Sequence, residues 1–235
     1  AARSLVPSSC SVPPSTFIPI AEEGSLIIDL GRWVIGEACR QIADWNRLGF
    51  GHLRVAVNLS MRQTRDEALP AFIDEVLKAT GVPAHCVELE VTESVLMEDT
   101  DLAVSQLARL RARGLKLAID DFGTGYSSMA YLGRLPIDKL KIDMAFVQAV
   151  PGEGEAIATA ILAMARAFGL SVVAEGVETA AQRDFFREAR CEQLQGYFIG
   201  RAVPAATFAS EWLQYPAGEE GRSPPSWDAP RLARR

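Results

Sequence analysis

The sequence contains little histidine and no closely spaced cysteines. Its two histidines, His52 and His85, belong to no His-Glu-x-x-His pattern, and its four cysteines include no Cys-x-x-Cys pair. The common zinc-site motifs need those spacings and are therefore excluded. Cysteines scattered in this way behave as small apolar side chains, which is typical of proteins in a reducing compartment. We therefore expect a cytoplasmic protein.

The sequence also lacks a long apolar run and an excess of basic residues. No stretch is long enough to span a bilayer and no signal-peptide pattern is visible, so we expect no membrane segment. A protein binds a nucleic-acid duplex through a broad basic face of its own surface. The net charge of −6 therefore argues against such a partner. With 235 residues, 49% of them hydrophobic, the chain has the size of one large α/β domain with a sizeable core.

The two ends of the sequence differ in composition from its middle. Residues 1–13 are rich in Ser and Pro and show no period, which predicts an irregular leader. Residues 216–235 combine prolines and arginines with little apolar content, which predicts a disordered tail. The domain itself is expected over residues 14–215.

Strand-like and helix-like segments alternate through this middle part. We expect strands at residues 53–59, 86–91, 115–119, 140–142, 171–174 and 191–195, with helices between them. Six strands with helical crossovers predict a parallel sheet. Polar residues follow the strand ends, which favours a TIM-like (β/α)₈ barrel because a barrel gathers strand ends into one mouth. An open doubly wound sheet is less favoured, because no glycine-rich phosphate loop is present.

Two helices carry apolar stripes that predict which face is buried. In residues 25–48 the predicted inward stripe is Leu26, Leu30, Trp33, Val34, Ala38, Ile42 and Trp45. In residues 153–168 it is Ile157, Ile161, Met164 and Phe168.

Two adjacent acids, Asp120 and Asp121, follow the apolar strand at residues 115–119. Neighbouring residues on a strand point to opposite faces, so we expect the strand to finish before them and the chain to turn at Gly123. Clustered carboxylates repel unless a cation or a shared proton neutralises them. An oxygen-only pair suits Mg²⁺ or Mn²⁺, although an isolated Asp-Asp pair is also compatible with a solvated acidic turn.

The ordered motifs VNLS, ELEVTES, DDFGTGYSS, KLKID, AEGVE and QGYFIG, preceded by FIPIAEE and GRWVIGEAC, resemble the EAL-domain family of bacterial cyclic di-GMP phosphodiesterases. The resemblance spans about residues 14–212. It implies a modified TIM barrel that opens cyclic di-GMP to linear pGpG with a two-metal site of Mg²⁺ or Mn²⁺. The Asp-Phe-Gly triplet also marks protein kinases, but no glycine-rich nucleotide loop accompanies it.

The resemblance assigns roles residue by residue. It implies metal ligands at Asn58, Glu90, Asp120, Asp121 and Glu175, and catalytic roles for Lys141, Glu175 and Asp121, with Lys141 orienting the attacking water. It implies substrate contacts at Gln195 and Gly196, and support of the site by Glu93, Gly123, Thr124, Gly125 and Glu178. On spacing alone, Asn58 is equally typical of a helix cap, Lys141 of a surface lysine, and Glu175 and Glu178 of first-turn acids.

The family's Glu-Ala-Leu tripeptide is expected on a strand before the FIPIAEE segment, and residues 1–15 do not contain it. We therefore expect a barrel incomplete at its N-terminal side. Two functions follow: a cyclic di-GMP phosphodiesterase whose activity depends on that segment, or a catalytically inactive cyclic di-GMP-binding or protein-interaction module. The expected partners are cyclic di-GMP, a second copy in a homodimer, and an upstream sensory or GGDEF domain.

Overall fold

The computed structural model describes residues 12–51, 53–93, 100–125 and 132–213. The predicted tail, and the predicted leader up to residue 11, lie outside the described residues. So does half of residues 128–135, where the sequence predicts a short helical stretch.

The described strands form one parallel sheet in the order β1-β2-β3-β4-β5-β6. Their bounds are β1 Val55–Leu59, β2 Val87–Thr92, β3 Lys116–Phe122, β4 Lys139–Ile142, β5 Ser171–Ala174 and β6 Gln193–Leu194. Within the described residues β1 and β6 are the two edges, and they do not pair with each other. The predicted α/β class with six parallel strands is confirmed, and the barrel is not closed.

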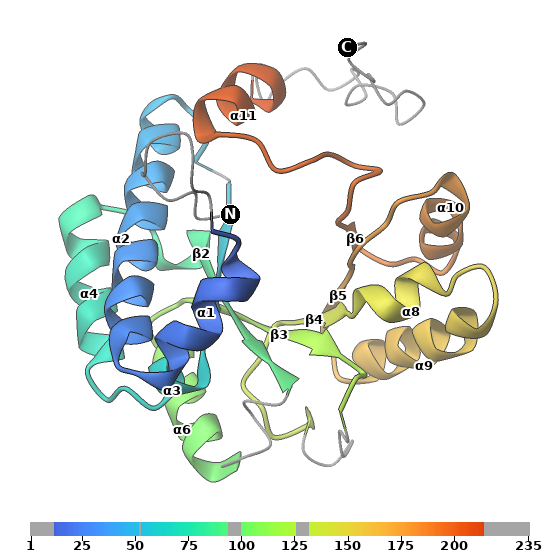
Figure 1. Ribbon diagram of the computed structural model, residues 1–235, viewed down its shortest axis with the longest axis horizontal. Coiled ribbons are helices and arrows are strands. Elements are labelled where there is room, and N and C mark those ends of the chain that lie inside the picture. Colours follow the sequence, from blue (N-terminus) through green and yellow to red (C-terminus); the bar gives the residue numbers. More distant parts are fainter. Residues whose placement is uncertain (1–11, 52, 94–99, 126–131, 214–235) are drawn as a thin grey trace.

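Helices surround the sheet on its outer side, as Figure 1 shows. Helices α2, α4 and α6 lie on the side of β1 and β2, and α8, α9 and α10 lie on the side of β4 to β6. The helices are α1 Pro14–Glu23, α2 Leu26–Arg47, α3 Met61–Thr64, α4 Leu69–Thr80, α6 Thr100–Arg111, α8 Met144–Gln148, α9 Glu153–Ala167, α10 Ala180–Glu188 and α11 Ala205–Trp212, with a 3₁₀ turn η1 at Ala84–Cys86. The Thr-x-x-Gln spacing of Thr179 and Gln182 in the sequence predicts a capping box, and the structure has it at the start of α10.

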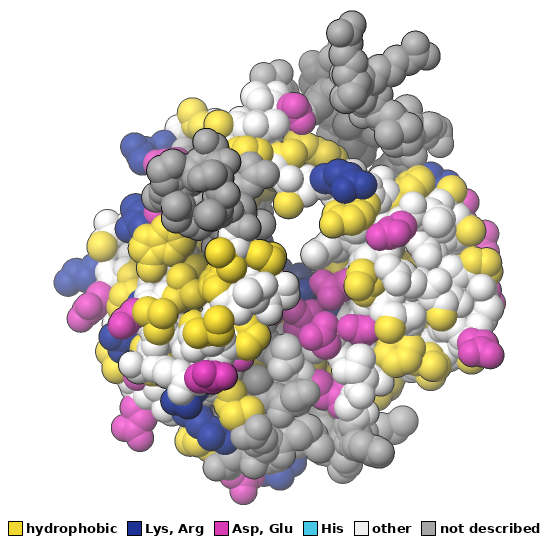
Figure 2. Space-filling view, viewed as in Figure 1, with side chains coloured by type: hydrophobic (Ala, Val, Ile, Leu, Met, Phe, Trp, Pro, Cys, Tyr) yellow, Lys and Arg dark blue, Asp and Glu magenta, His cyan; other side chains and the backbone are white. Residues whose placement is uncertain are grey.

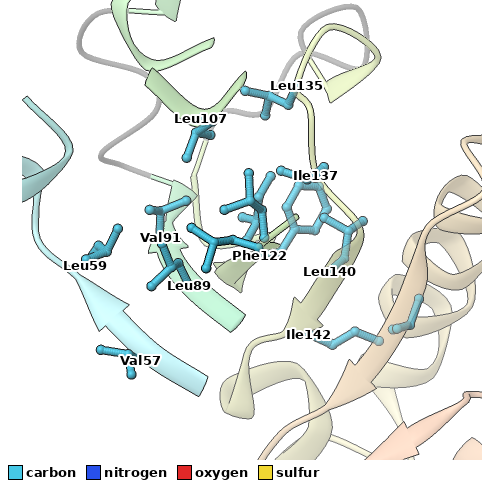
Figure 3. Packing of buried hydrophobic residues seen from close by; sticks show 14 of the residues in the cluster. Val57, Leu59, Leu89, Val91, Leu107, Phe122, Leu135, Ile137, Leu140 and Ile142 are labelled. Carbon is cyan, nitrogen blue, oxygen red and sulfur yellow. The ribbon is translucent and has the colours of Figure 1, made fainter. Parts of the chain in front are cut away.

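The two faces of the sheet have opposite chemistry. Successive strand residues point to opposite faces, so the residues at alternate positions face the helices and are apolar, whereas the inner face carries the charged residues of β2, β3 and β4 beside a few apolar ones such as Ala56 and Val173. The outward set is buried and packs into one core: Val57, Leu59, Leu89, Val91, Leu117, Ile119, Leu140, Ile142, Val172 and Ala174. Figure 3 shows part of this layer, with Leu107 and Leu135 packed near Val91 and Phe122. The polar inner face is therefore free to build a site.

The predicted helix stripes are wrong in part. Leu26 of α2 is 62% exposed and Trp33 is 46% exposed, whereas Ile27 and Ile35, which the predicted stripe omits, are buried, so the buried face is rotated from the predicted one. Ile42 is buried as predicted. The wide apolar arc of α2 leaves its orientation open to tertiary contacts, here with α4 and β1. Likewise Ile157 and Phe168 are exposed, while Ala158, Ile161 and Leu162 of α9 are buried.

These burial differences predict unequal costs for equal truncations. We expect Leu89→Ala, at a fully buried position in β2, to lower the free energy of unfolding by about 2–5 kcal/mol because it leaves a cavity. Leu26→Ala, at an exposed position, should change it by less than about 1 kcal/mol. Urea unfolding of both variants measures this, and equal losses would contradict the assigned faces.

Candidate active site

One lysine occupies the centre of the polar inner face. The Nζ atom of Lys141 lies 2.9 Å from Glu90 Oε2, 2.9 Å from Asp120 Oδ1 and 2.7 Å from Glu175 Oε1. Its side chain is only 5% exposed. These acids come from three strand segments, β2, β3 and the end of β5, so the lysine joins three parts of the sheet. It is not a surface lysine.

Asp120, Asp121 and Glu175 each place a carboxylate oxygen within 4.8 Å of the others. Strand β3 extends through Phe122, so the prediction that the strand ends before Asp120 is wrong. The two acids still meet because the pairing of β3 with β4 shifts between Ile119 and Phe122 and Asp121 adopts a left-handed φ of 53°. Such an irregularity inserts an extra residue and re-aims a side chain. Figure 2 shows acidic side chains gathered in the central hollow of this face.

Burial is the largest cause of the pKa shifts of Glu175, Glu90 and Asp121. It raises the pKa of Glu175 to about 7, against the lowering effect of Lys141. Burial likewise raises the pKa of Glu90, and burial together with the charges of Asp120 and Asp143 raises that of Asp121. The surrounding carboxylates raise the pKa of Lys141, so its ammonium stays charged at neutral pH. A cluster of this kind favours bound cations, because they relieve the cost of the charged carboxylates.

The remaining predicted ligand and substrate residues lie along the two edges of the sheet. Asn58 of β1 stands beside Glu90 in the parallel register and is exposed. Gln195 directly follows β6 and its N–H donates to the carbonyl of Ala174, next to Glu175. Gly196 lies against Val177, where a Cβ would come within 2.3 Å of backbone atoms. The structure therefore places these residues at the same end of the sheet as Asp120 and Glu175.

Of the residues predicted to support the site, Glu93, Gly123 and Thr124 are hydrogen-bonded around the loop, whereas Glu178 is exposed to solvent. Glu93 is buried and its Oε2 accepts a hydrogen bond from Gly123 N–H at 2.9 Å. Its other oxygen lies where a Cβ on Gly125 would stand, so Glu93 holds the loop closely. The Thr124 hydroxyl donates to the Asp121 carbonyl at 2.9 Å. Glu178 is exposed, and its backbone N–H donates to Gln182 Oε1.

A second buried ion pair, which was not predicted from the sequence, lies deeper on the inner face. Lys139 Nζ lies 2.7 Å from Glu88 Oε1, and Arg54 lies 3.3 Å from the other oxygen of Glu88. Lys139 and Glu88 stand two residues before Lys141 and Glu90, so the same strand period stacks both pairs. A cavity of about 300 Å³ is lined by both pairs and by residues of β1 and β6. Glu88 and Glu90 are two residues apart, and so are Lys139 and Lys141. This equal spacing is the feature of the sequence from which the second pair could have been predicted.

The decisive comparison is with known families. Residues 6–202 match the family described as the EAL domain. The chain belongs to the EAL domain family. The bifunctional diguanylate cyclase/cyclic di-GMP phosphodiesterase MucR of Pseudomonas aeruginosa is 43% identical over 197 residues, which are 83% of this chain and 29% of MucR. The cyclic di-GMP phosphodiesterase NbdA of the same organism is 44% identical over 202 residues, 85% of this chain and 26% of NbdA.

The fold comparison agrees with this family. A solved structure described as PaMucR phosphodiesterase in complex with c-di-GMP superimposes on this EAL domain with a TM-score of 0.84 at 41% identity, over 88% of this chain and 84% of that chain. The predicted family and the TIM-like fold class are thus confirmed. The chain spans less than a third of the length of MucR and NbdA. None of the helices in the described ranges has the length and apolar character needed to traverse a bilayer.

The donor set of this EAL domain fits a hard divalent cation. Asp120, Asp121 and Glu175 supply only carboxylate oxygens. Glu90, which contacts the Lys141 ammonium, supplies a further carboxylate. Oxygen ligands without sulfur or imidazole are those that Mg²⁺ and Mn²⁺ prefer. The letters Glu-Ala-Leu occur at residues 67–69, but there Glu67 is exposed at a turn before α4 and supplies no member of the cluster.

Removal of the central ammonium should destabilise the fold. We expect Lys141→Met to lower the free energy of unfolding by about 3–5 kcal/mol, because it leaves buried carboxylates unpaired. Lys116→Met is the matched control: Lys116 also bonds a carboxylate, Asp138 at 3.0 Å, but is 35% exposed, so its loss should cost about 1 kcal/mol or less. Urea unfolding without metal measures both, and similar costs would contradict the role of Lys141.

The raised pKa of Glu175 predicts a pH dependence of stability. Between about pH 4.5 and 7 the folded protein keeps a proton on Glu175 that the unfolded chain has released. The free energy of unfolding should therefore fall as pH rises through this window. Glu175→Gln cannot titrate, so its stability should fall less steeply in urea titrations from pH 5 to 8. Parallel slopes for the two proteins would show that Glu175 is not the group.

Proposed function

We propose that this EAL domain is a cyclic di-GMP phosphodiesterase that uses Mg²⁺ or Mn²⁺ to open its substrate to linear pGpG. The convergence of Asp120, Asp121 and Glu175 carries the proposal. Relatives named as cyclic di-GMP phosphodiesterases, and a similar fold solved with c-di-GMP, support it further.

Each residue takes a role that its position allows. Asp120, Asp121 and Glu175, with Glu90 and Asn58 beside them, would hold the cations, which when bound supply an activated water and charge neutralisation at the phosphodiester. The Lys141 ammonium, fixed by three carboxylates, can orient the attacking water or stabilise the charge that grows on the phosphate.

The substrate would lie across the ends of the strands. Gln195 and Gly196 follow β6, so they bound the site on the side of the sheet opposite Asn58 of β1. Glu93 keeps the loop after Asp121 in place through Gly123. This arrangement would bring the scissile phosphodiester next to the cluster formed by the acids and Lys141.

A second candidate function is cyclic di-GMP binding without turnover. Lys141 favours it, because its ammonium already balances part of the negative charge and holds the acids together without a divalent cation.

The reaction is tested with cyclic di-GMP and Mn²⁺, with pGpG measured by chromatography. We expect Asp121→Asn and Glu175→Gln each to lower turnover by about 100-fold or more, because each removes a carboxylate that would hold a cation. EDTA should stop the reaction and added Mn²⁺ should restore it. Asp74→Asn is the control: Asp74 is an exposed acid bonded to Arg113, and turnover should not change.

The two functions give different results in the same assay. Absence of pGpG after long incubation of the unsubstituted protein would contradict the phosphodiesterase. Calorimetric binding of cyclic di-GMP without product would then assign the chain to the second function, and absence of both would contradict both.

A further inference from the structure

Helix α8 contacts the two loops that follow the acids of the cluster, one at Gly123 and one at Gly176. The helix begins at Met144, directly after β4 and Asp143, so only two residues separate it from Lys141. Asp143 caps the helix by accepting a hydrogen bond from Ala145 N–H at 2.7 Å. The same carboxylate also interacts with Asp121 and contributes to the raised pKa of that residue.

The first contact is between Met144 and Gly176, the residue after Glu175. Gly176 has a left-handed φ of 69°, and a Cβ there would lie 2.3 Å from Met144 Cγ and 3.0 Å from its Sδ. The Met144 side chain therefore lies directly against the backbone that carries Glu175. In addition, Glu175 N–H donates a hydrogen bond to the Ile142 carbonyl at 3.2 Å. The loop that carries Glu175 therefore contacts both Ile142 and Met144.

The second contact is between Phe146 and Gly123, two residues after Asp121. Gly123 has φ of 102°, and a Cβ there would lie 2.8 Å from Phe146 Cε2 and 3.3 Å from Ile161 Cδ1. Phe146 is partly buried and packs against the core. The loop that follows the two aspartates therefore packs against the aromatic ring of Phe146.

We propose that Met144 and Phe146 are positioning residues, which set the distance between Glu175 and the Asp120–Asp121 pair through their contacts with Gly176 and Gly123. The two side chains lie two residues apart on one short helix, so the spacing of the two loops follows from the helix itself. A cluster whose oxygens lie within 4.8 Å depends on that spacing. The consequence for metal affinity and turnover rests on the proposed function, whereas the consequence for loop order does not.

Met144 is the better test of the two, because its side chain is 49% exposed and its loss removes little core packing. We expect Met144→Ala to free the Glu175 loop while the fold persists. Met144→Leu keeps most of the contact and should behave like the unsubstituted chain. Ile157→Ala is the matched control: Ile157 is 41% exposed on the neighbouring α9 and belongs to neither loop contact.

The primary measurement is hydrogen–deuterium exchange in the metal-free protein. The amides of Glu175 and Val177 both donate to carbonyls, so their exchange reports the order of the loop. We expect Met144→Ala to speed their exchange about tenfold or more, with the amides of β2 unchanged, and Met144→Leu and Ile157→Ala to leave all of them within about twofold. Unchanged exchange at Glu175, or equal acceleration in β2, would overturn the proposal.

The functional measurement is separate. We expect Met144→Ala to weaken Mn²⁺ binding in calorimetry by about 10-fold and to lower kcat by a similar factor with KM within about twofold. Faster exchange at Glu175 in a protein that never hydrolyses cyclic di-GMP would contradict the proposed function and leave the positioning role standing. Unchanged exchange in an active enzyme would do the opposite.

Discussion

A buried ammonium between three carboxylates is the interaction on which the site depends. Acids at the ends of separate strands repel, and burial makes each of them costly to charge. Lys141 offsets both effects with three contacts of 2.7–2.9 Å, and so holds Glu90, Asp120 and Glu175 in one place. The deeper Lys139–Glu88 pair repeats this arrangement two residues earlier, so the inner face of the sheet is a stack of charge pairs.

The rest of the domain keeps those pairs in register. Apolar residues at alternate positions of every strand face the helices, which leaves the inner face to polar side chains. Parallel pairing brings the strand ends together, and the irregularity at Asp121 turns a second aspartate toward the same point. Helix α8, Glu93 and their glycine contacts then fix the two loops. The proposed chemistry and the stability of the fold therefore depend on the same residues.

Much of this arrangement was predictable from the sequence, because it depends on local periods and caps. The six strands, the parallel sheet and the capping box at Thr179 follow from alternation and spacing. What escaped prediction depends on tertiary contacts: the orientation of α2, the extension of β3 through Asp121, and the short α8, which has too few residues to show a period. Glu88 escaped because its partner Lys139 is 51 residues away.

Lys141 and Glu175 stabilise each other as a buried pair, and a double-mutant cycle measures this interaction directly. The free energies of unfolding of the unsubstituted chain, Lys141→Met, Glu175→Gln and the double variant are measured at pH 8 without metal. We expect a coupling energy of about 2 kcal/mol or more, since the residues are in contact within one network. Additive costs, within about 0.5 kcal/mol, would contradict it.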